Sequence, residues 1–118
     1  MIDEDARTLA TVAARVADDA HATEILVLQV GEVLAVTEYF VVASASNRRL
    51  VNAVVEEVEA EVKERIGRAP LRVEGVREQQ WVLMDYGDVV VHVFLSEIRD
   101  FYEIERLYTD VPKLDWAE

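Results

Sequence analysis

Hydrophobic residues recur along this chain with two different periods, which predict helices alternating with strands. From Ile2 to residue 20 they recur every three or four positions with charged residues between them, as in an amphipathic helix. The same spacing extends over residues 50–66, where Ser46 is the expected N-cap and Gly67 is expected to end the helix. A last helix is expected with Ser96 as its N-cap and an apolar face formed by Ile98, Phe101, Tyr102, Leu107 and Tyr108.

Short apolar runs predict strands between these helices. Residues 24–30 are almost continuously apolar, so we expect a strand covered on both faces. Residues 39–43 and 71–74 are the next strand candidates. With no repeat or linker to divide the chain, we expect one domain over residues 1–110 and a tail over residues 111–118, in which Trp116 folds back.

The segment WVLMDYGDVVVHVF predicts a β-hairpin, because Gly87-Asp88 suits a type II′ two-residue turn between two runs of period two. A turn at this position pairs Tyr86 with Val89 and sends alternate side chains to opposite faces. One face receives Val82, Met84, Tyr86, Val89, Val91 and Val93. The other receives Trp81, Leu83, Asp85, Val90, His92 and Phe94. This second face mixes aromatic rings with a carboxylate and an imidazole, so we expect a functional site there.

Charge and composition restrict the partners. The 118 residues include 24 acidic and 12 basic side chains, a formal net charge of −12, which disfavours direct nucleic-acid binding and favours a basic protein partner. The chain has no Cys, which excludes disulfides and thiolate chemistry. No apolar run approaches the roughly 20 residues of a membrane helix, and the N-terminus lacks a signal pattern, so we expect a cytoplasmic protein without a membrane partner.

The residue pattern predicts no catalytic, cofactor or metal site. Asp85 and His92 are candidates for an acid–base pair, but they lie two residue pairs apart in the predicted register and no Ser or Thr is placed as a nucleophile. A structural His92, satisfied by a polar neighbour, is favoured. Asp85, Asp88, His92 and Glu97 lack the spacing of known metal motifs, and no glycine-rich phosphate loop is present.

Three blocks of sequence resemble one known family. They are VTEYFVVASASNRRLVNAVVEEVE, EGVREQQWVLMDYGDVVVHVF and the run from Arg99 to Tyr108. In order and spacing, across roughly residues 6–110, the chain resembles the ribosomal silencing factors, also called RsfS or Iojap-like proteins. The resemblance implies a nucleotidyltransferase-like α/β domain with the order α-β-β-α-β-β-β-α and a mixed sheet of about five strands flanked by helices.

The family resemblance also implies a function. A similar protein binds the large ribosomal subunit through large-subunit ribosomal protein fourteen, blocks joining of the small subunit and represses translation under nutrient limitation. It is a homodimer and not an enzyme. An acidic domain fits that role, because ribosomal RNA would repel it while a basic ribosomal protein would attract it.

Carried over by position, the resemblance implies a partner-binding set composed of Trp81, Leu83, Asp85, His92, Arg99, Tyr102 and Glu105. In this set Trp81 is the expected apolar anchor and Asp85 an acidic contact. Arg99, Tyr102 and Glu105 are expected on one face of the last helix, either touching the partner or forming a structural ion-pair and packing cluster.

The chain departs from the family pattern at Glu38, Ala45, Leu50 and Tyr108, where Asp, Gly, Gln and Trp are usual. The alternative hypothesis is a divergent enzyme of the same fold that acts through Asp85, Asp88 and His92. The Gly-Ser turn and paired acids of the catalytic members of that superfamily are not found in this sequence, and fold alone does not imply activity.

Overall fold

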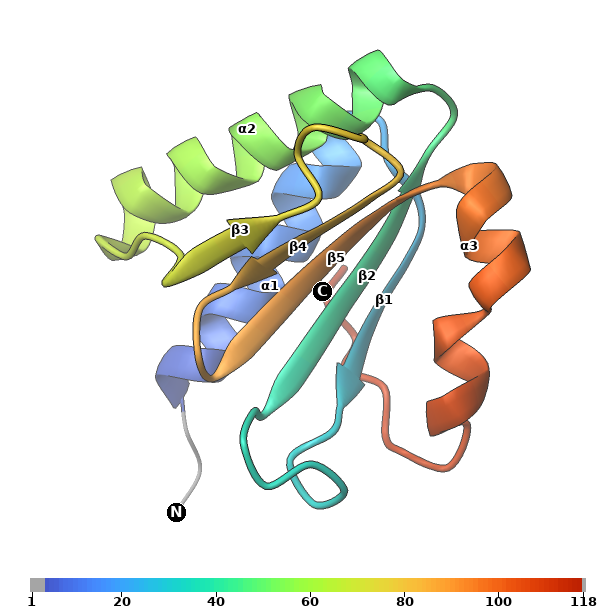
Figure 1. Ribbon diagram of the computed structural model, residues 1–118. Coiled ribbons are helices and arrows are strands. Elements are labelled where there is room, and N and C mark those ends of the chain that lie inside the picture. Colours follow the sequence, from blue (N-terminus) through green and yellow to red (C-terminus); the bar gives the residue numbers. More distant parts are fainter. Residues whose placement is uncertain (1–3, 118) are drawn as a thin grey trace.

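Five strands form one mixed sheet in the computed structural model, which describes residues 4–117 (Figure 1). The elements are α1 (Glu4–Asp19), β1 (Thr23–Gln29), β2 (Tyr39–Ala45), α2 (Arg48–Ile66), β3 (Arg72–Glu74), β4 (Trp81–Asp85), β5 (Val89–Leu95), α3 (Ser96–Tyr102) and a 3₁₀ helix η1 (Ile104–Tyr108). The strand order is β1-β2-β5-β4-β3, and only β2 and β5 run parallel. The predicted fold class and element order are confirmed.

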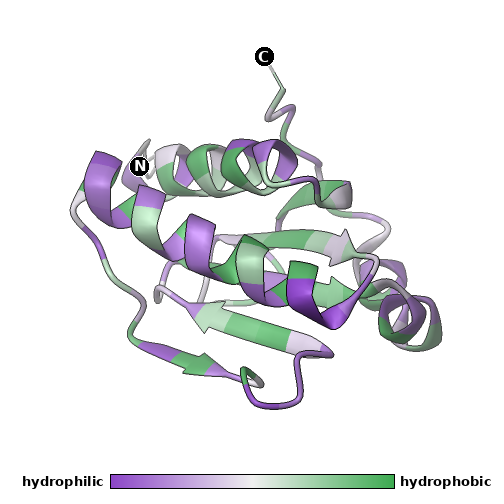
Figure 2. Cartoon of the chain, turned by 90° about the horizontal axis from the view of Figure 1, so that it is seen from above, coloured by the Kyte–Doolittle hydropathy of each residue, from purple (hydrophilic) through white to green (hydrophobic). Residues whose placement is uncertain are grey.

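Helices α1 and α2 cover one face of the sheet (Figure 1). Both are amphipathic, and Figure 2 shows hydrophilic and hydrophobic segments alternating along them above a largely hydrophobic sheet. Ile2, expected in the first helix, lies outside the described residues. The core beneath the helices includes Leu9, Ala13, Val16, Val27, Val41, Val51, Val54, Val58, Val62, Met84, Tyr86, Val91 and Val93. Burial of these side chains supplies most of the force that holds the helix layer on the sheet.

A second, smaller core lies on the opposite face, where α3 and η1 cover the β1 and β2 end of the sheet. Its buried members are Leu28, Val30, Phe40, Val42, Phe94 and Ile104. Strand β1 contributes Val27 to the helix-side core and Leu28 to this one, so the strand is covered on both faces as predicted. Helix α3 contacts β5 at one end, but over the rest of β4 and β5 this face carries no helix among residues 4–117 (Figure 1), and we call that part the open face.

The hairpin has the predicted register. Trp81 pairs with Phe94, Leu83 with His92, and Asp85 with Val90. The Tyr86 amide donates to the Val89 carbonyl at 2.9 Å, and Gly87 has φ of 93°, as a type II′ turn requires at its first central position. All six residues expected on the apolar face are buried in the helix-side core.

Both expected N-caps are wrong. Asn47, not Ser46, caps α2, because its side-chain oxygen accepts from the Leu50 amide at 2.8 Å. Ser96 is already the first residue of α3, since β5 runs directly into this helix, and its hydroxyl instead donates to the carbonyl of Ala45 at 3.1 Å. The predicted end of α2 at Gly67 is confirmed, with this residue in the left-handed region at φ 79°.

The last helix is shorter than expected, because the chain turns at Glu103. This residue has φ of 47° and separates α3 from η1. A continuous helix would hold Arg99 and Glu105 about 120° apart, since six residues make about 600° of rotation. The expectation that they share a face of one helix with Tyr102 is therefore wrong; the turn, not helical spacing, brings Glu105 back to Arg99.

The C-terminal segment folds back along β1, as expected for Trp116. The amide of Gln29 donates to the carbonyl of Pro112, and the amide of Leu114 donates to that of Val27, both at 2.9 Å. The Trp116 indole donates to the Ile25 carbonyl at 3.3 Å. This segment pairs with the outer edge of β1 and packs against the helix-side core.

The capping assignment predicts that substitutions at two neighbouring positions differ in their effect on stability. Replacing Asn47 by Ala should lower the free energy of unfolding by about 1 kcal/mol, because the Leu50 amide loses its acceptor. Replacing Ser46 by Ala should change it by less than about 0.5 kcal/mol, since Ser46 is exposed and precedes the cap. Urea unfolding of both variants measures the difference, and equal losses would contradict the assignment.

Candidate protein-binding face of the sheet

The open face carries the four sheet residues expected to bind a partner. Trp81, Leu83 and Asp85 come from β4 and His92 from β5, and alternation along the strands places all four on the side away from α1 and α2. Gly75 helps to position the first of them: a Cβ there would lie 2.1 Å from the Trp81 carbonyl oxygen, and φ is 88°. The chain can enter β4 this closely only because residue 75 has no side chain.

A continuous network of rings crosses this face. The Trp81 indole lies 4.8 Å from Phe94 and 5.2 Å from Tyr102 between ring centroids. The imidazole of His92 lies 6.0 Å from Trp81 and 4.6 Å from Phe40. Two further contacts extend the network to Phe101 at one end and Tyr108 at the other. We call these seven rings the aromatic network; it joins β2, β4 and β5 to α3 and η1.

His92 is held in one protonation state by its surroundings. The side chain is 3% exposed, and its Nδ1 accepts a hydrogen bond from the Trp81 indole at 3.1 Å. Because an indole N–H can only donate, the neutral imidazole carries its proton on Nε2. Burial lowers the pKa of His92 from 6.5 to about 4, so the ring is neutral at physiological pH. This favours the structural role that the sequence suggested for it.

The carboxylates proposed for catalysis are engaged in ion pairs. Asp88, at the hairpin turn, accepts from both terminal nitrogens of Arg68 at 2.8 and 3.0 Å. Asp85 accepts from the amide of Gly87 at 2.8 Å and from Arg72 at 3.2 Å. Each acid therefore stabilises the turn or the neighbouring strand, which does not support the enzyme hypothesis. Within residues 4–117, side chains capable of holding a metal do not gather in groups of three or more.

Arg99 anchors α3 to the sheet. Its side chain is 3% exposed and donates to the Ser44 hydroxyl at 2.8 Å and to the Glu24 carbonyl. Its Nε also contacts Glu105 at 3.4 Å. The structural ion pair that the sequence left open is thus present, and it fixes α3 and η1 over β1 and β2.

Tyr102, which the resemblance placed in the partner-binding set, lies in an exposed apolar patch with Phe101 and Leu107, two residues that sequence reasoning did not assign to that set. The periodicity predicted a buried face, but Phe101, Tyr102 and Leu107 are 78%, 54% and 76% exposed. Ile98 and Ile104 take the inward positions instead. Exposed aromatic side chains beside the aromatic network are typical of an interaction surface rather than a core. Their outward position depends on the turn at Glu103, which periodicity could not indicate.

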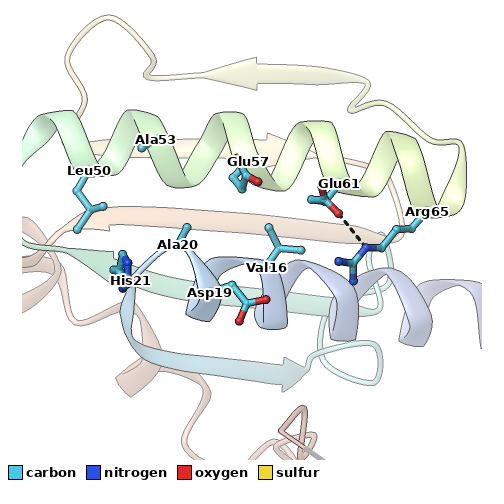
Figure 3. A pocket seen from close by; sticks show the side chains of 9 residues that line it. All are labelled: Val16, Asp19, Ala20, His21, Leu50, Ala53, Glu57, Glu61 and Arg65. Atoms are coloured by element: carbon cyan, nitrogen blue, oxygen red, sulfur yellow. Dashed lines mark hydrogen bonds and ion pairs between the residues drawn. The ribbon is translucent and has the colours of Figure 1, made fainter.

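On the helix side of the sheet, a hollow lies between α1 and α2 (Figure 3). It measures about 420 Å³, and its small apolar residues include Ala20 and Ala53. Asp19 and Glu57 lie on it, and Glu61 is paired with Arg65 at 2.9 Å. These acids belong to the polar faces of the two amphipathic helices.

The departures from the family pattern fit the local structure. Ala45 lies within β2 in extended backbone, which any residue adopts. Leu50 packs against the helix-side core, and Tyr108 packs edge-on against Phe40 at 5.4 Å. In the described part of the chain, none of the helices is long and apolar enough to cross a membrane.

Comparison with known proteins gives consistent results over the whole domain. Residues 3–118 match a family model described as "Ribosomal silencing factor during starvation". The chain is 35% identical over 109 residues to ribosomal silencing factor RsfS of Bacillus subtilis, covering 92% of each chain. It is 33% identical over 91 residues, 75% of this chain, to 40% of the mouse protein named "Mitochondrial assembly of ribosomal large subunit protein 1". A crystal structure of a Chromobacterium violaceum protein superposes with a TM-score of 0.83 at 32% identity, covering 87% of this chain and 85% of that one.

The neutral state of His92 predicts an acid-sensitive fold. The unfolded chain takes up a proton on this residue as the pH falls through 6.5, whereas the folded chain resists protonation until about pH 4. Stability is therefore lost across that window, by on the order of 3 kcal/mol. His92 lines a pocket on the open face, and the charged residues that line it too are Asp85 and Arg72.

The measurement is urea unfolding at several pH values for the wild type and for His92→Phe. The variant lacks the titrating ring, so its stability should fall less steeply between pH 6.5 and pH 4. Parallel profiles for the two proteins would show that His92 does not cause the loss.

The Arg99 anchor predicts a large effect from a single substitution. Arg99→Met should lower the free energy of unfolding by about 3 kcal/mol, because it leaves Glu105, Ser44 and the Glu24 carbonyl without their donor. The matched control is Arg106→Met, which breaks the exposed pair with Glu103 and should cost less than about 0.5 kcal/mol. Chemical denaturation measures both, and similar costs would contradict the anchoring role.

Proposed function

This chain belongs to the ribosomal silencing factor family, and we propose that it represses translation by binding the large ribosomal subunit through large-subunit ribosomal protein fourteen and blocking joining of the small subunit. The observation that carries the proposal is the aromatic network, which crosses the sheet face away from α1 and α2 and ends in the exposed rings of Phe101 and Tyr102 on α3. Such a surface, on a member of this family, is suited to bind a protein partner.

Trp81 is the proposed anchor of that interface. The indole is half-buried, supported underneath by Phe94 and at its side by Tyr102, and its N–H is fixed by His92. A ring held in this way loses little freedom on binding, which favours affinity. Leu83, next to it on the open face, adds apolar contact area.

The charge around the anchor favours a basic partner. Residues 96–110, which form α3, η1 and the start of the C-terminal segment, contain five acidic and two basic residues. A negative rim next to an aromatic centre attracts a basic ribosomal protein and repels the phosphates of ribosomal RNA. Asp85 is the proposed acidic contact on the sheet itself.

Arg99 and Glu105 support the interface from below in this proposal. Their ion pair holds α3 and η1 against the sheet, and this places Tyr102 beside Trp81. We therefore assign them as positioning residues, and Tyr102 as the residue of that set that contacts the partner.

The proposed mechanism is steric, so it needs no catalysis and no cofactor. The mouse relative is named for assembly of the ribosomal large subunit, which supports a ribosomal partner for the family. We propose that the protein acts in the cytoplasm, where ribosomes join their subunits, and that it forms a homodimer.

The experiment is cosedimentation of the protein with purified large ribosomal subunits, followed by pull-down of large-subunit ribosomal protein fourteen. Trp81→Ala should weaken binding about 30-fold, as expected when a central aromatic anchor worth about 2 kcal/mol is removed. Tyr102→Ala should weaken it less, and since this ring is 54% exposed the fold should be unaffected. The same variants should restore subunit joining in a reassociation assay.

The matched control is Glu57→Ala, which lies on α2 on the opposite side of the sheet and should bind as the wild type does. Circular dichroism and thermal melting check that each variant is folded. Failure of the wild type to cosediment, or unchanged binding by both aromatic variants, would overturn the proposal.

A further inference from the structure

A pocket of about 400 Å³ opens on the open face beside the aromatic network. Phe40, Leu83 and Val90 contribute apolar walls, and His92 and Thr37 also line it. Val36 and Leu71 at the pocket are 86% and 75% exposed, so apolar side chains meet solvent around it.

Two residues that line this pocket each have a buried polar atom with no hydrogen-bond partner within the described chain. These atoms are Nε2 of His92 and Oγ1 of Thr37, on side chains that are 3% and 6% exposed. The Trp81 hydrogen bond to Nδ1 leaves the His92 proton on Nε2, which makes this atom a donor. The threonine hydroxyl can accept as well as donate.

We propose that this pocket receives the carboxamide side chain of an asparagine or glutamine of the protein partner; the inference rests on the proposed function and specifies its contact. The amide oxygen accepts from His92 Nε2, and the amide nitrogen donates to Thr37 Oγ1. The carbon stem of the side chain lies against the apolar walls. One neutral group thereby satisfies two atoms that the fold leaves unpaired.

Other side chains match the pocket less well. A lysine or arginine would bring donors to the Nε2 donor of His92, and the rim already holds Arg72. A carboxylate would have to be desolvated close to Asp85 in a protein of net charge −12. A purely apolar side chain would fill the space but leave both polar atoms unpaired, which is costly in a dry interface.

Docking requires a local movement, because neither polar atom is in contact with solvent. Backbone hydrogen bonds hold the β1–β2 connection at Leu34, whose amide donates to Val30, and at Glu38, whose amide donates to Asp88. Thr37 and the exposed Val36 lie between these two anchors. In this proposal the segment between them shifts to expose the hydroxyl, and neither anchor has to break.

The test uses Thr37→Val, which replaces the hydroxyl by a methyl group of similar size. Because the hydroxyl has no partner in the free protein, the variant should melt at the same temperature as the wild type or higher. It should nevertheless bind purified large-subunit ribosomal protein fourteen about tenfold more weakly, the effect of one lost hydrogen bond in a buried interface. Thr37→Ser keeps the hydroxyl and should bind as the wild type does.

Tyr86→Phe is the matched control. It also removes a buried hydroxyl that has no partner, but from the helix side of the sheet. It should leave the melting temperature equal or higher and leave binding unchanged. The Gln and Asn residues on the partner's surface are then replaced by Leu one at a time. In the partner variant that lacks the residue entering the pocket, Thr37→Val should weaken binding no further.

Each outcome separates this inference from the proposed function. If Trp81→Ala weakens binding and Thr37→Val does not, the pocket inference is overturned and the proposed function stands. If Thr37→Val lowers the melting temperature, the hydroxyl has a partner inside the fold and the inference is overturned. If no single Asn or Gln of the partner couples to Thr37, the assignment of a carboxamide is wrong. If the wild type does not bind, both proposals are wrong.

Discussion

The two-residue turn between β4 and β5 determines on which face of the sheet the candidate binding residues of these two strands lie. Side chains alternate along a strand, so a shift of one residue in the hairpin register would exchange the two faces of β4 against β5. The register is fixed at the turn by the positive φ of Gly87 and by Asp88, which Arg68 holds through two hydrogen bonds. The ion pair at the turn therefore helps to place the indole of Trp81 on the sheet face away from α1 and α2.

Regular elements could be predicted from the sequence because their determinants are local. The hairpin register depends on a Gly-Asp pair between two alternating runs, and the end of α2 at Gly67 depends on one left-handed residue. The choice of Asn47 over Ser46 as cap could not be predicted, since both residue types cap helices and the two are neighbours in the sequence. The turn at Glu103 follows from long-range contacts of Arg99 with β1 and β2, which periodicity does not contain.

The candidate site shows the same division. The shared face of Trp81, Leu83, Asp85 and His92 followed from alternation alone. Burial of Arg99 and exposure of Phe101 reverse the usual preference of each residue type, and neither could be deduced without the tertiary fold. Thr37 was not identified because its importance lies in the lack of an internal partner in the described structure, which is a property of packing and not of spacing.

The two edges of the sheet are protected against other chains in different ways. At β1 the backbone of residues 112–114 occupies the outer hydrogen-bonding groups. At β3 the edge strand has only three residues, and two of them, Arg72 and Glu74, are charged. Short, charged edges are poor templates for β-aggregation. The protein can thus expose aromatic rings while its sheet edges resist amyloid-like stacking. Association with other molecules is therefore left to side chains, because the backbone at both edges is protected from pairing.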